Sequence, residues 1–246
     1  MIKTYNMKQF IQLSLFILAF SMTNSIMAQK MLKMEGVTVV DHPIESFTDL
    51  ELNGAFNIYL SQGTEEKLFL ENDDKVLPNL LVHQNGNKLI IERKENFNRK
   101  KLKKYKIFIT VNNLEELEMN GVGQVRCLQI LKLNRLDLEH NGVGRFELAI
   151  NAKRLHGNFT GIGRITLKGA VATADITMDG IGKLNAFDLQ TEDLVIERNG
   201  IGRVEIHASA SLKVANNGIG NVRYDGNPKR VQKESGAIGT IRASRR

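Results

Sequence analysis

A short glycine motif recurs along the second half of the chain and constrains its fold more than any other feature. Six copies have Gly-Val-Gly or Gly-Ile-Gly at their centre: MNGVGQV (119–125), HNGVGRF (140–146), FTGIGRI (159–165), MDGIGKL (178–184), RNGIGRV (198–204) and NNGIGNV (216–222). A looser seventh copy, ESGAIGTI, occupies 234–241. The first glycines stand at 121, 142, 161, 180, 200 and 218, so the steps are 21, 19, 19, 20 and 18 residues. The motif therefore repeats about every nineteen residues.

Apolar residues alternate with polar ones on both sides of each glycine pair. Leu138 precedes one pair, and Phe146 and Leu148 follow it. A period of two is typical of a strand and not of a helix. Each repeat is thus predicted to contain a short strand, a tight glycine corner, a second strand and a polar return.

A nineteen-residue unit cannot bury its own apolar face, but stacked units give every strand a neighbour and build one continuous core. The sequence therefore predicts an all-β fold, a parallel β-solenoid with turns of about nineteen residues. Seven turns at about 4.8 Å each stack to roughly 34 Å. We expect regular turns over residues 113–246, and N-terminal strands and a cap of the same solenoid over 29–112. That stretch keeps strand-like alternation, an Asn85-Gly86-Asn87 hairpin turn and a degenerate corner at Asn53–Phe56.

The repeated glycines are expected to shape the corners of the turns and not to bind a ligand. We expect the first of each pair to take positive φ and the second to let adjacent turns approach without a Cβ between them. The central Val or Ile is expected to stack as an apolar column in the core. A phosphate-binding loop would need a helix after the glycines, and no helical periodicity follows any copy. The structural corners are Gly121, Gly123, Gly142, Gly144, Gly161, Gly163, Gly180, Gly182, Gly200, Gly202, Gly218 and Gly220.

The first thirty residues have the pattern of a secretory signal peptide. Lys3 and Lys8 precede an apolar run, FIQLSLFILAF (10–20), which is followed by small and polar residues up to Ala28. The run is shorter than the roughly 20 residues that a membrane span needs. We therefore expect a signal peptide over 1–28, no transmembrane segment in the mature chain, and export to the periplasm, the outer surface or the extracellular space.

Composition excludes several classes of protein. With 34 Lys and Arg against 27 Asp and Glu, the formal charge is +7, which is too small by itself to demand a nucleic-acid partner. Export makes nucleic acid an unexpected target in any case. The single cysteine, Cys127, excludes a disulfide scaffold and a cysteine-based zinc cluster. We expect it to be a small buried apolar side chain.

The chain resembles a known family. The segment from Phe47 to Phe56 reads Phe-x-x-Leu-x-Leu-x-Gly-Ala-Phe, and Asn-Gly-Ile-Gly corners follow it. With the signal peptide, this pattern is similar to the head GIN domain family of putative adhesins, which are exported bacterial proteins. The resemblance covers roughly residues 44–242. It implies a right-handed single-stranded parallel β-helix and an adhesive role, and it carries over no catalytic or binding residues.

The sequence contains few signs of a catalytic or metal-binding site. The nucleophile elbow, the zinc-protease motif and the EF-hand loop are absent, and the five histidines are scattered. Calcium-binding β-rolls place an aspartate in every short repeat, whereas the residue after the second glycine here is mostly basic. We expect no metal, no cofactor and no catalytic residue.

That basic position gives one candidate binding surface. Stacking would align Arg145, Arg164, Lys183 and Arg203 as a ladder of cations. Glu147 and Glu205, two places further on, could relieve the repulsion. Two interpretations remain open: a solvated charged face that discourages aggregation, or an anion-binding stripe for phosphate, lipopolysaccharide or acidic glycan.

A second basic cluster precedes the repeats. It is either a solvated loop or a contact for anionic envelope polymers. Its residues are Arg93, Lys94, Arg99, Lys100, Lys101, Lys103, Lys104 and Lys106.

Three hypotheses about function follow. The first is an exported, non-catalytic adhesin or binding module for cell-surface or envelope components, including anionic glycan. The second is a structural envelope protein that self-associates as a homo-oligomer through the solenoid ends. The third is a polysaccharide lyase or hydrolase, which would need converging carboxylates; Asp175, Asp179, Asp188 and Asp193 are the densest acids, and none recurs beside another at a ladder position.

Overall fold

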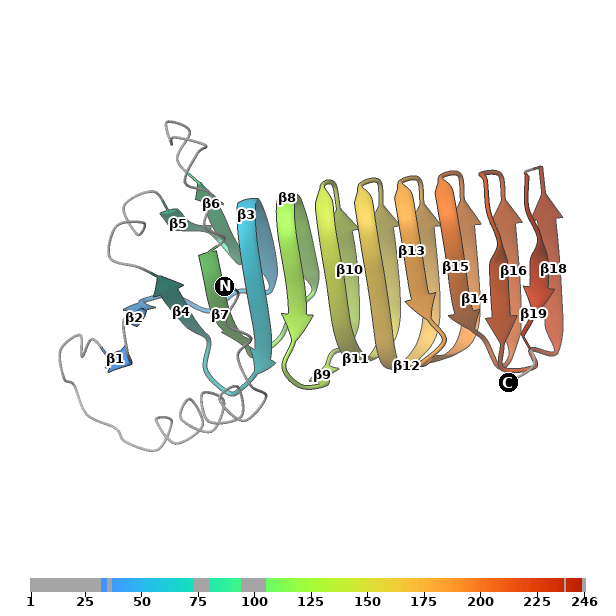
Figure 1. Ribbon diagram of the computed structural model, residues 1–246. Coiled ribbons are helices and arrows are strands. Elements are labelled where there is room, and N and C mark those ends of the chain that lie inside the picture. Colours follow the sequence, from blue (N-terminus) through green and yellow to red (C-terminus); the bar gives the residue numbers. More distant parts are fainter. Residues whose placement is uncertain (1–31, 35–36, 73–79, 94–104, 237, 245–246) are drawn as a thin grey trace. The chain divides into compact units, whose positions relative to one another are not determined.

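The computed structural model describes residues 32–34, 37–72, 80–93, 105–236 and 238–244. These residues form strands joined by turns, and no helix occurs among them. Most of these strands pair in parallel and wind as a β-solenoid, and antiparallel pairs occur in the N-terminal part (Figure 1). The predicted all-β solenoid is confirmed, and consecutive turns are offset by 18 to 21 residues, as in the pairing of Val143 with Val122 and with Ile162.

Each regular turn contributes one segment before its glycine corner and one after it. The segments before the corners pair with one another and form what we call the leading face; the segments after the corners form the trailing face. A single long strand such as β11 bends at the lower edge and belongs to both faces (Figure 1). The regular strands are β8 (Glu116–Cys127), β9 (Leu131–Lys132), β10 (Arg135–His140), β11 (Val143–Phe159), β12 (Ile162–Met178), β13 (Ile181–Ala186), β14 (Leu189–Arg198), β15 (Ile201–His207), β16 (Ser211–Asn216), β17 (Val222–Asp225), β18 (Arg230–Ser235) and β19 (Ile241–Ala243).

The N-terminal strands combine parallel and antiparallel pairing. Strand β3 (Asp49–Gln62) pairs in parallel with β8 on one side, and with β6 (Lys88–Arg93) and β7 (Tyr105–Val111) on the other. Gly54 lies in register with Gly121, so the degenerate corner expected at Asn53–Phe56 is confirmed.

The remaining strands in this part run antiparallel to their neighbours. Strand β4 (Lys67–Asn72) pairs with β7 and with β2 (Val37–His42), and β2 also pairs with β1 (Leu32–Met34). Strand β5 (Leu80–Asn85) forms a hairpin with β6 through Gly86, whose φ is 59°. The hairpin predicted from Asn85-Gly86-Asn87 is therefore confirmed.

One hydrophobic core fills the interior of the stack. Inward positions alternate with outward ones along each strand, as a period of two requires. The inward residues stack in columns, for example Leu138 beside Leu117, and Phe146 between Val125 and Ile165. Cys127 packs against the same core, and burial raises the pKa of its thiol to about 11. The side chain is partly buried at the edge of this core, and so is less enclosed than the sequence led us to expect.

Candidate functional site

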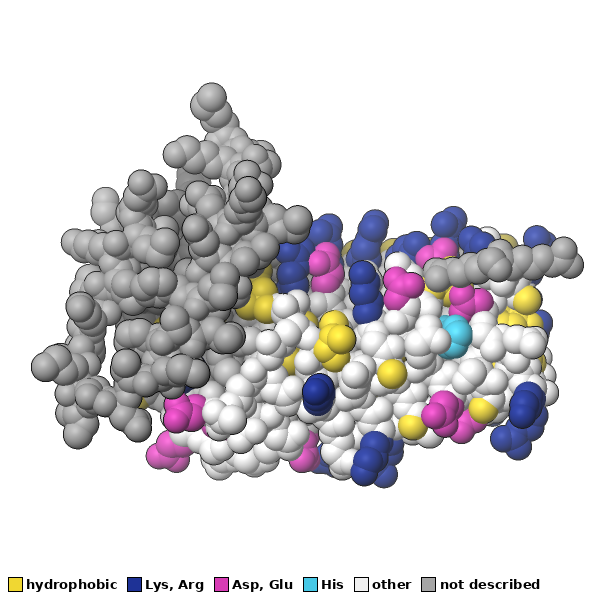
Figure 2. All heavy atoms as spheres, turned by 90° about the horizontal axis from the view of Figure 1, so that it is seen from below, with side chains coloured by type: hydrophobic (Ala, Val, Ile, Leu, Met, Phe, Trp, Pro, Cys, Tyr) yellow, Lys and Arg dark blue, Asp and Glu magenta, His cyan; other side chains and the backbone are white. Residues whose placement is uncertain are grey.

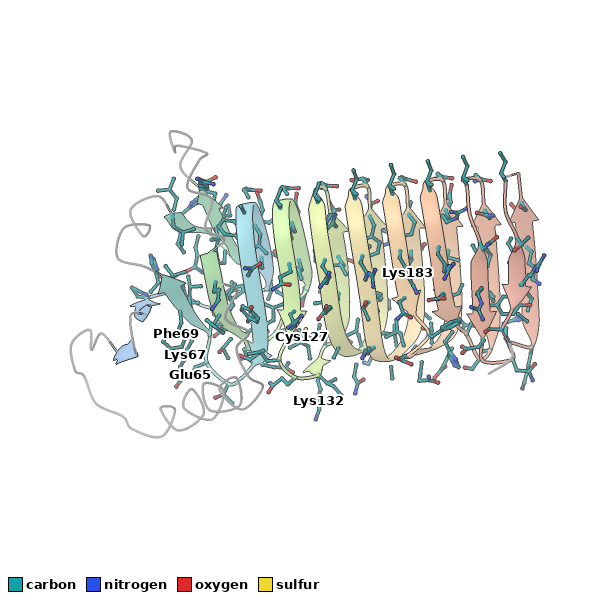
Figure 3. The ribbon with its side chains drawn as sticks, viewed as in Figure 1. Glu65, Lys67, Phe69, Cys127, Lys132 and Lys183 are labelled. Carbon is teal, nitrogen blue, oxygen red and sulfur yellow. The ribbon has the colours of Figure 1, made fainter. Side chains whose placement is uncertain are left out.

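The glycine corners form one sharp edge of the solenoid, along the upper side of Figure 1. At each corner the central Val or Ile points outward, and side chains project from the tips of the turns in Figure 3. The exposed fraction is 51% for both Ile162 and Ile181. The expectation that these residues form a column in the core is therefore wrong. We call the column the aliphatic ridge: Val122, Val143, Ile162, Ile181, Ile201, Ile219 and Ile238.

The alternation of the strands explains this outcome. In the turn of Val143, the inward residues Leu138, His140 and Phe146 are all even-numbered. The period of two continues through the corner, so the odd-numbered Val143 falls on the outer side. The inward positions at the corner itself are occupied by the two glycines.

Both glycines of a pair are needed because successive corners touch. A Cβ on Gly200 would overlap the carbonyl oxygen of Gly180, and a Cβ on Gly202 would overlap that of Gly182. Positive φ occurs at four of the six second glycines, for example 144° at Gly202, and at none of the six first glycines. The roles expected for the two glycines are corrected accordingly: the unusual φ, where it occurs, is at the second glycine, and both glycines allow the close approach.

The four predicted cations stack in register on the trailing face, two residues after the ridge. Arg145 pairs with Arg164, Arg164 with Lys183, and Lys183 with Arg203. We call this column the cation ladder. Its position on an outward row is the one that the sequence indicated, and Lys183 is labelled in Figure 3.

Carboxylates neutralise only part of the ladder. The Lys183 ammonium lies 2.5 Å from Glu205, and the Arg145 guanidinium lies 3.8 Å from Glu147, which also binds Arg126 at 2.7 Å. Arg164 and Arg203 are exposed and form no ion pair with any described residue. These two guanidinium groups are the parts of the ladder best placed to meet an anion from outside.

The other flank of the ridge carries a ladder of hydrogen-bonded polar side chains on the leading face. Asn141 donates to Asn120 at 3.0 Å, Thr160 donates to Asn141 at 2.6 Å, and Asn199 donates to Asp179 at 2.7 Å. These bonds connect successive turns. The sequence signal for this ladder is the polar residue directly before each glycine pair, which is Asn in four of the six copies.

Two polar side chains lie inside the corner and were not singled out from the sequence. Arg198 is 2% exposed, and its guanidinium donates to Asn216 Oδ1 at 2.7 Å and to the carbonyl oxygens of Gly202, Ile219 and Gly220 at 3.1, 2.7 and 3.0 Å. Burial lowers the pKa of its guanidinium below the ordinary value for arginine. Arg198 therefore ties adjacent corners together and has a structural role.

His140 occupies the equivalent inward position three turns earlier. Its ring lies edge-on to that of Phe146, with the ring centroids 5.1 Å apart. It is 2% exposed, and burial lowers its pKa from 6.5. It is thus a core histidine, and its burial favours the neutral form of the ring.

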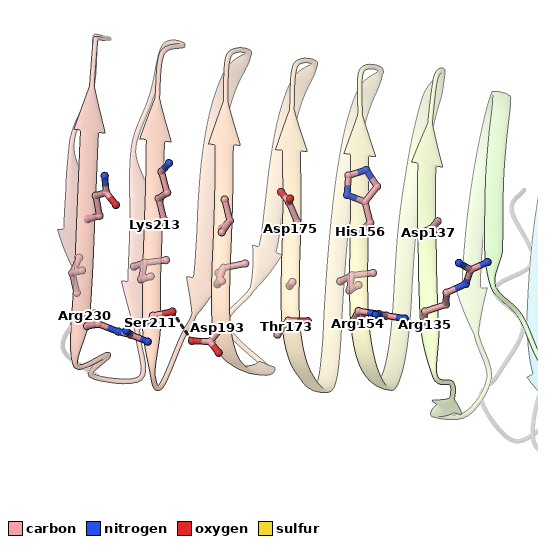
Figure 4. A pocket seen from close by; sticks show the side chains of 17 residues that line it. Arg135, Asp137, Arg154, His156, Thr173, Asp175, Asp193, Ser211, Lys213 and Arg230 are labelled. Carbon is pink, nitrogen blue, oxygen red and sulfur yellow. Dashed lines mark hydrogen bonds between the residues drawn. The ribbon is translucent and has the colours of Figure 1, made fainter.

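A trough of 660 Å³ runs across the leading face (Figure 4). One of its walls is the column from Arg135 through Arg154 and Thr173 to Arg230, and Ser211 donates to Asp193 at 2.5 Å within it. The facing column includes Asp137, His156, Asp175 and Lys213. The trough thus mixes cations and acids and has no dominant charge.

Most of the second basic cluster lies outside the described residues: Lys94, Arg99, Lys100, Lys101, Lys103 and Lys104. Arg93 ends β6, and Lys106 lies in β7. The signal-peptide region also lies outside the described part of the chain. Within that part, no group of three or more His, Cys, Asp or Glu side chains could hold a metal ion, and no helix is long and apolar enough to cross a membrane.

Comparisons with known proteins agree with this architecture. A family model described as "Putative auto-transporter adhesin, head GIN domain" matches residues 46–228. No curated protein gives a match.

Several solved structures have the same fold. A crystal structure of a putative adhesin from Bacteroides fragilis has a TM-score of 0.82 and 24% identity, over 86% of this chain and 98% of that chain. A putative adhesin from Parabacteroides merdae has a TM-score of 0.63 and 18% identity, over 86% and 97% of the two chains. A putative lipid binding protein from Parabacteroides distasonis has a TM-score of 0.62 and 19% identity, over 86% and 98%. At these identities, the likeness establishes a common fold.

Proposed function

Because the chain belongs to the family described as putative auto-transporter adhesins with a head GIN domain, we propose that it is an exported, non-catalytic binding module for anionic polymers of the cell surface or envelope. The family description supports an adhesive role at the cell surface. The signal-peptide pattern of residues 1–28 supports export.

The observation that carries this proposal is the cation ladder. It places a positive charge at four successive turns, about 4.8 Å apart, along the straight outer surface of the solenoid. Two neighbouring charges at that distance repel by ~0.9 kcal/mol in water. An anionic polymer lying along the ladder would remove this repulsion and would meet the unpaired Arg164 and Arg203.

A regular row of charges suits an extended partner with regularly spaced charges, such as an acidic polysaccharide or lipopolysaccharide. Long basic side chains adapt to such a partner because their aliphatic stems can fan out over the sheet. The basic cluster between Arg93 and Lys106 would extend the attraction beyond the regular turns. The non-catalytic assignment rests on the mixed charges of the trough, where basic side chains lie among Asp137, Asp175 and Asp193 and where Asp193 accepts a hydrogen bond from Ser211.

The experiment compares two quadruple variants that remove the same number of charges from opposite faces. The ladder variant is Arg145→Gln/Arg164→Gln/Lys183→Gln/Arg203→Gln, and the control variant is Arg135→Gln/Arg154→Gln/Lys213→Gln/Arg230→Gln in the trough. Binding of each purified protein to immobilised acidic polysaccharides and to lipopolysaccharide is measured, with a lyase and hydrolase assay on the same polymers.

Loss of four exposed ion pairs at about 0.5 kcal/mol each should weaken binding about 30-fold in the ladder variant. The control variant should bind nearly as well as wild type. Equal losses in both variants, or none in the ladder variant, would argue against the ladder as the binding surface. Release of polymer fragments by wild type would contradict the non-catalytic assignment.

A further inference from the structure

The aliphatic ridge is exposed along the whole edge of the regular solenoid, although the fold does not need apolar side chains there. Its exposed fractions range from 45% at Val122 to 75% at Ile238. Every position holds a β-branched aliphatic residue, and none holds the Thr that would suit a strand equally well beside water. A continuous apolar stripe of this kind on a soluble surface marks an interaction site.

The rest of the described surface has no comparable stripe. Exposed aliphatic residues elsewhere, such as Leu81, Ile130 and Val195, stand singly on different elements. Viewed from below, the opposite edge of the turns shows scattered apolar side chains among charges of both signs (Figure 2). The ridge is therefore distinct from the ordinary background of exposed apolar residues.

The two flanks of the ridge carry opposite charge. On the trailing flank, the outward positions two and four residues after the ridge, from 124 to 223, hold six cations and two acids. On the leading flank, the outward positions two and four residues before it, from 118 to 217, hold four acids and no cation. The cations are Arg126, Arg145, Arg164, Lys183, Arg203 and Arg223, with the acids Glu147 and Glu205; the leading acids are Glu118, Glu139, Asp179 and Glu197.

This distribution selects the partner. An anionic lipid surface would attract the trailing flank and repel the leading flank, so the strip as a whole gains little from it. A second copy of the same strip matches it when the copies are related by a two-fold axis parallel to the solenoid axis, because that rotation places each cationic flank against the other copy's acidic flank. A two-fold axis perpendicular to the solenoid axis would instead bring cations against cations.

We propose that the aliphatic ridge is a self-association surface, on which a second copy of this chain docks side by side and in the same direction. The two ridges pack against each other, and the flanking charges pair turn by turn. Because the two-fold axis is parallel to the solenoid axis, each turn stays level with the same turn of the other copy. Arg145 then faces Glu139 of the second copy, Lys183 faces Asp179, and Arg203 faces Glu197, and each contact occurs twice because the interface is isologous.

The size of the ridge sets the strength of this contact. Seven positions about 4.8 Å apart span roughly 29 Å, and a strip only a few side chains wide buries less than the roughly 800 Å² per partner of a standard interface. We therefore expect a weak dimer, with a dissociation constant between about 10 µM and about 1 mM. Copies held close together on a surface would dimerise more readily, because tethering raises their effective concentration.

The dimer and an anionic polymer would both use Arg145, Lys183 and Arg203. The two partners should therefore exclude each other, and an acidic polysaccharide should dissociate the dimer. The dimer itself does not depend on the proposed function, since it is measured without any polymer.

A charge-swap experiment on the full chain tests the proposal. One variant reverses the basic flank, Arg145→Glu/Arg203→Glu, and the other reverses the acidic flank, Glu139→Lys/Glu197→Lys. All four side chains are outward-facing and partly or fully exposed, and an unchanged thermal transition identifies folded variants. Self-association is measured by sedimentation velocity at low salt from about 1 µM to about 1 mM.

Each variant alone should self-associate at least tenfold more weakly than wild type, because like charges then face each other. The equimolar mixture should associate as tightly as wild type or more tightly, since one copy then has two acidic flanks and the other two basic flanks. Wild type that stays monomeric up to about 1 mM, or a mixture that associates no better than its components, would overturn the proposal. Either result would leave polymer binding by the ladder untouched.

The apolar part of the interface has its own test. Ile162→Thr/Ile181→Thr/Ile201→Thr keeps the β-branched shape and removes three methyl contacts per copy, and should weaken self-association at least tenfold. Val195→Thr, at an equally accessible aliphatic position on the leading face, is the matched control and should have no effect. An equal response to both changes would count against the ridge.

Discussion

A single added methyl group should distinguish the two kinds of residue at the corner. Gly202→Ala places a Cβ against the carbonyl oxygen of Gly182 in the preceding turn, at a φ of 144°. The backbone strain costs about 1–3 kcal/mol. Relief of the overlap would also separate these two turns and weaken the bonds between them from the amide of Gly200 to Met178, 3.0 Å, and from the amide of Ile201 to Gly180, 3.0 Å. At about 1 kcal/mol each, the total loss is about 3–5 kcal/mol.

Ile201→Ala at the neighbouring position should have a much smaller effect. Its side chain is 48% exposed, so removal of three carbon atoms loses about half of the transfer free energy of a buried side chain, or about 1 kcal/mol. Urea unfolding followed by far-ultraviolet circular dichroism would measure both free energies of unfolding. Equal losses for the two variants would refute the close contact of successive corners and the outward direction of the ridge.

Three further predictions concern side chains inside the stack. In urea unfolding, Arg198→Ala should lower the free energy of unfolding by about 3–5 kcal/mol, because four acceptors lose their hydrogen-bond donor. Arg198→Met refills the space beside Met178 and should cost roughly half as much; equal costs would contradict the role of Arg198 in joining adjacent corners. Burial lowers the pKa of His140 below the 6.5 of the unfolded chain, so unfolding takes up a proton and stability should fall as the pH drops through about 6.5. Urea titrations at several pH values should show a smaller fall in stability for His140→Met, and an unchanged fall would mean that another group causes the pH dependence. With a pKa of about 11, the Cys127 thiol is roughly 0.1% ionised at pH 8, so thiol reagents should label native protein more than 100-fold more slowly than urea-unfolded protein. Fast labelling of the native protein would contradict the raised pKa.

The repeat and the register of the outward rows could be predicted because both follow from local sequence. The nineteen-residue spacing of Gly142, Gly161 and Gly180 fixes which residues stack, and the period of two fixes which residues share a side. The alignment of Arg145 with Arg164 follows from these two facts alone. For the same reason, alternation through Leu138 and Phe146 already required Val143 to point outward.

The prediction that the aliphatic corner residues point inward is wrong because it follows hydrophobicity, whereas the alternation of the strand decides the direction of the side chain. An apolar residue is usually buried, but a corner with glycine on both inward sides has no room for a side chain there. The same alternation could have placed Arg198 and His140 inward, since they follow Ile196 and Leu138 by two residues. The hydrogen bonds that satisfy the buried guanidinium, in contrast, depend on carbonyl oxygens of its own corner and of the next corner, and only the three-dimensional arrangement reveals them.

The order of the N-terminal strands in the sheet could not be predicted from the sequence. Strand β3 lies between β8 and the β6–β7 pair, although four strands separate β3 from β8 along the chain. Alternation identifies each of these segments as a strand, but it carries no information about which distant strand becomes its neighbour.

The salt dependence of polymer binding tests the proposed function most directly. Each cation that contacts an anionic polymer releases a counterion, so the logarithm of the affinity falls in proportion to the logarithm of the salt concentration, with a slope close to the number of contacts. Wild type should show a slope steeper by about three to four than that of the Arg145→Gln/Arg164→Gln/Lys183→Gln/Arg203→Gln variant, with acidic polysaccharide as the partner. The same slope for both proteins would mean that the cation ladder does not contact the polymer.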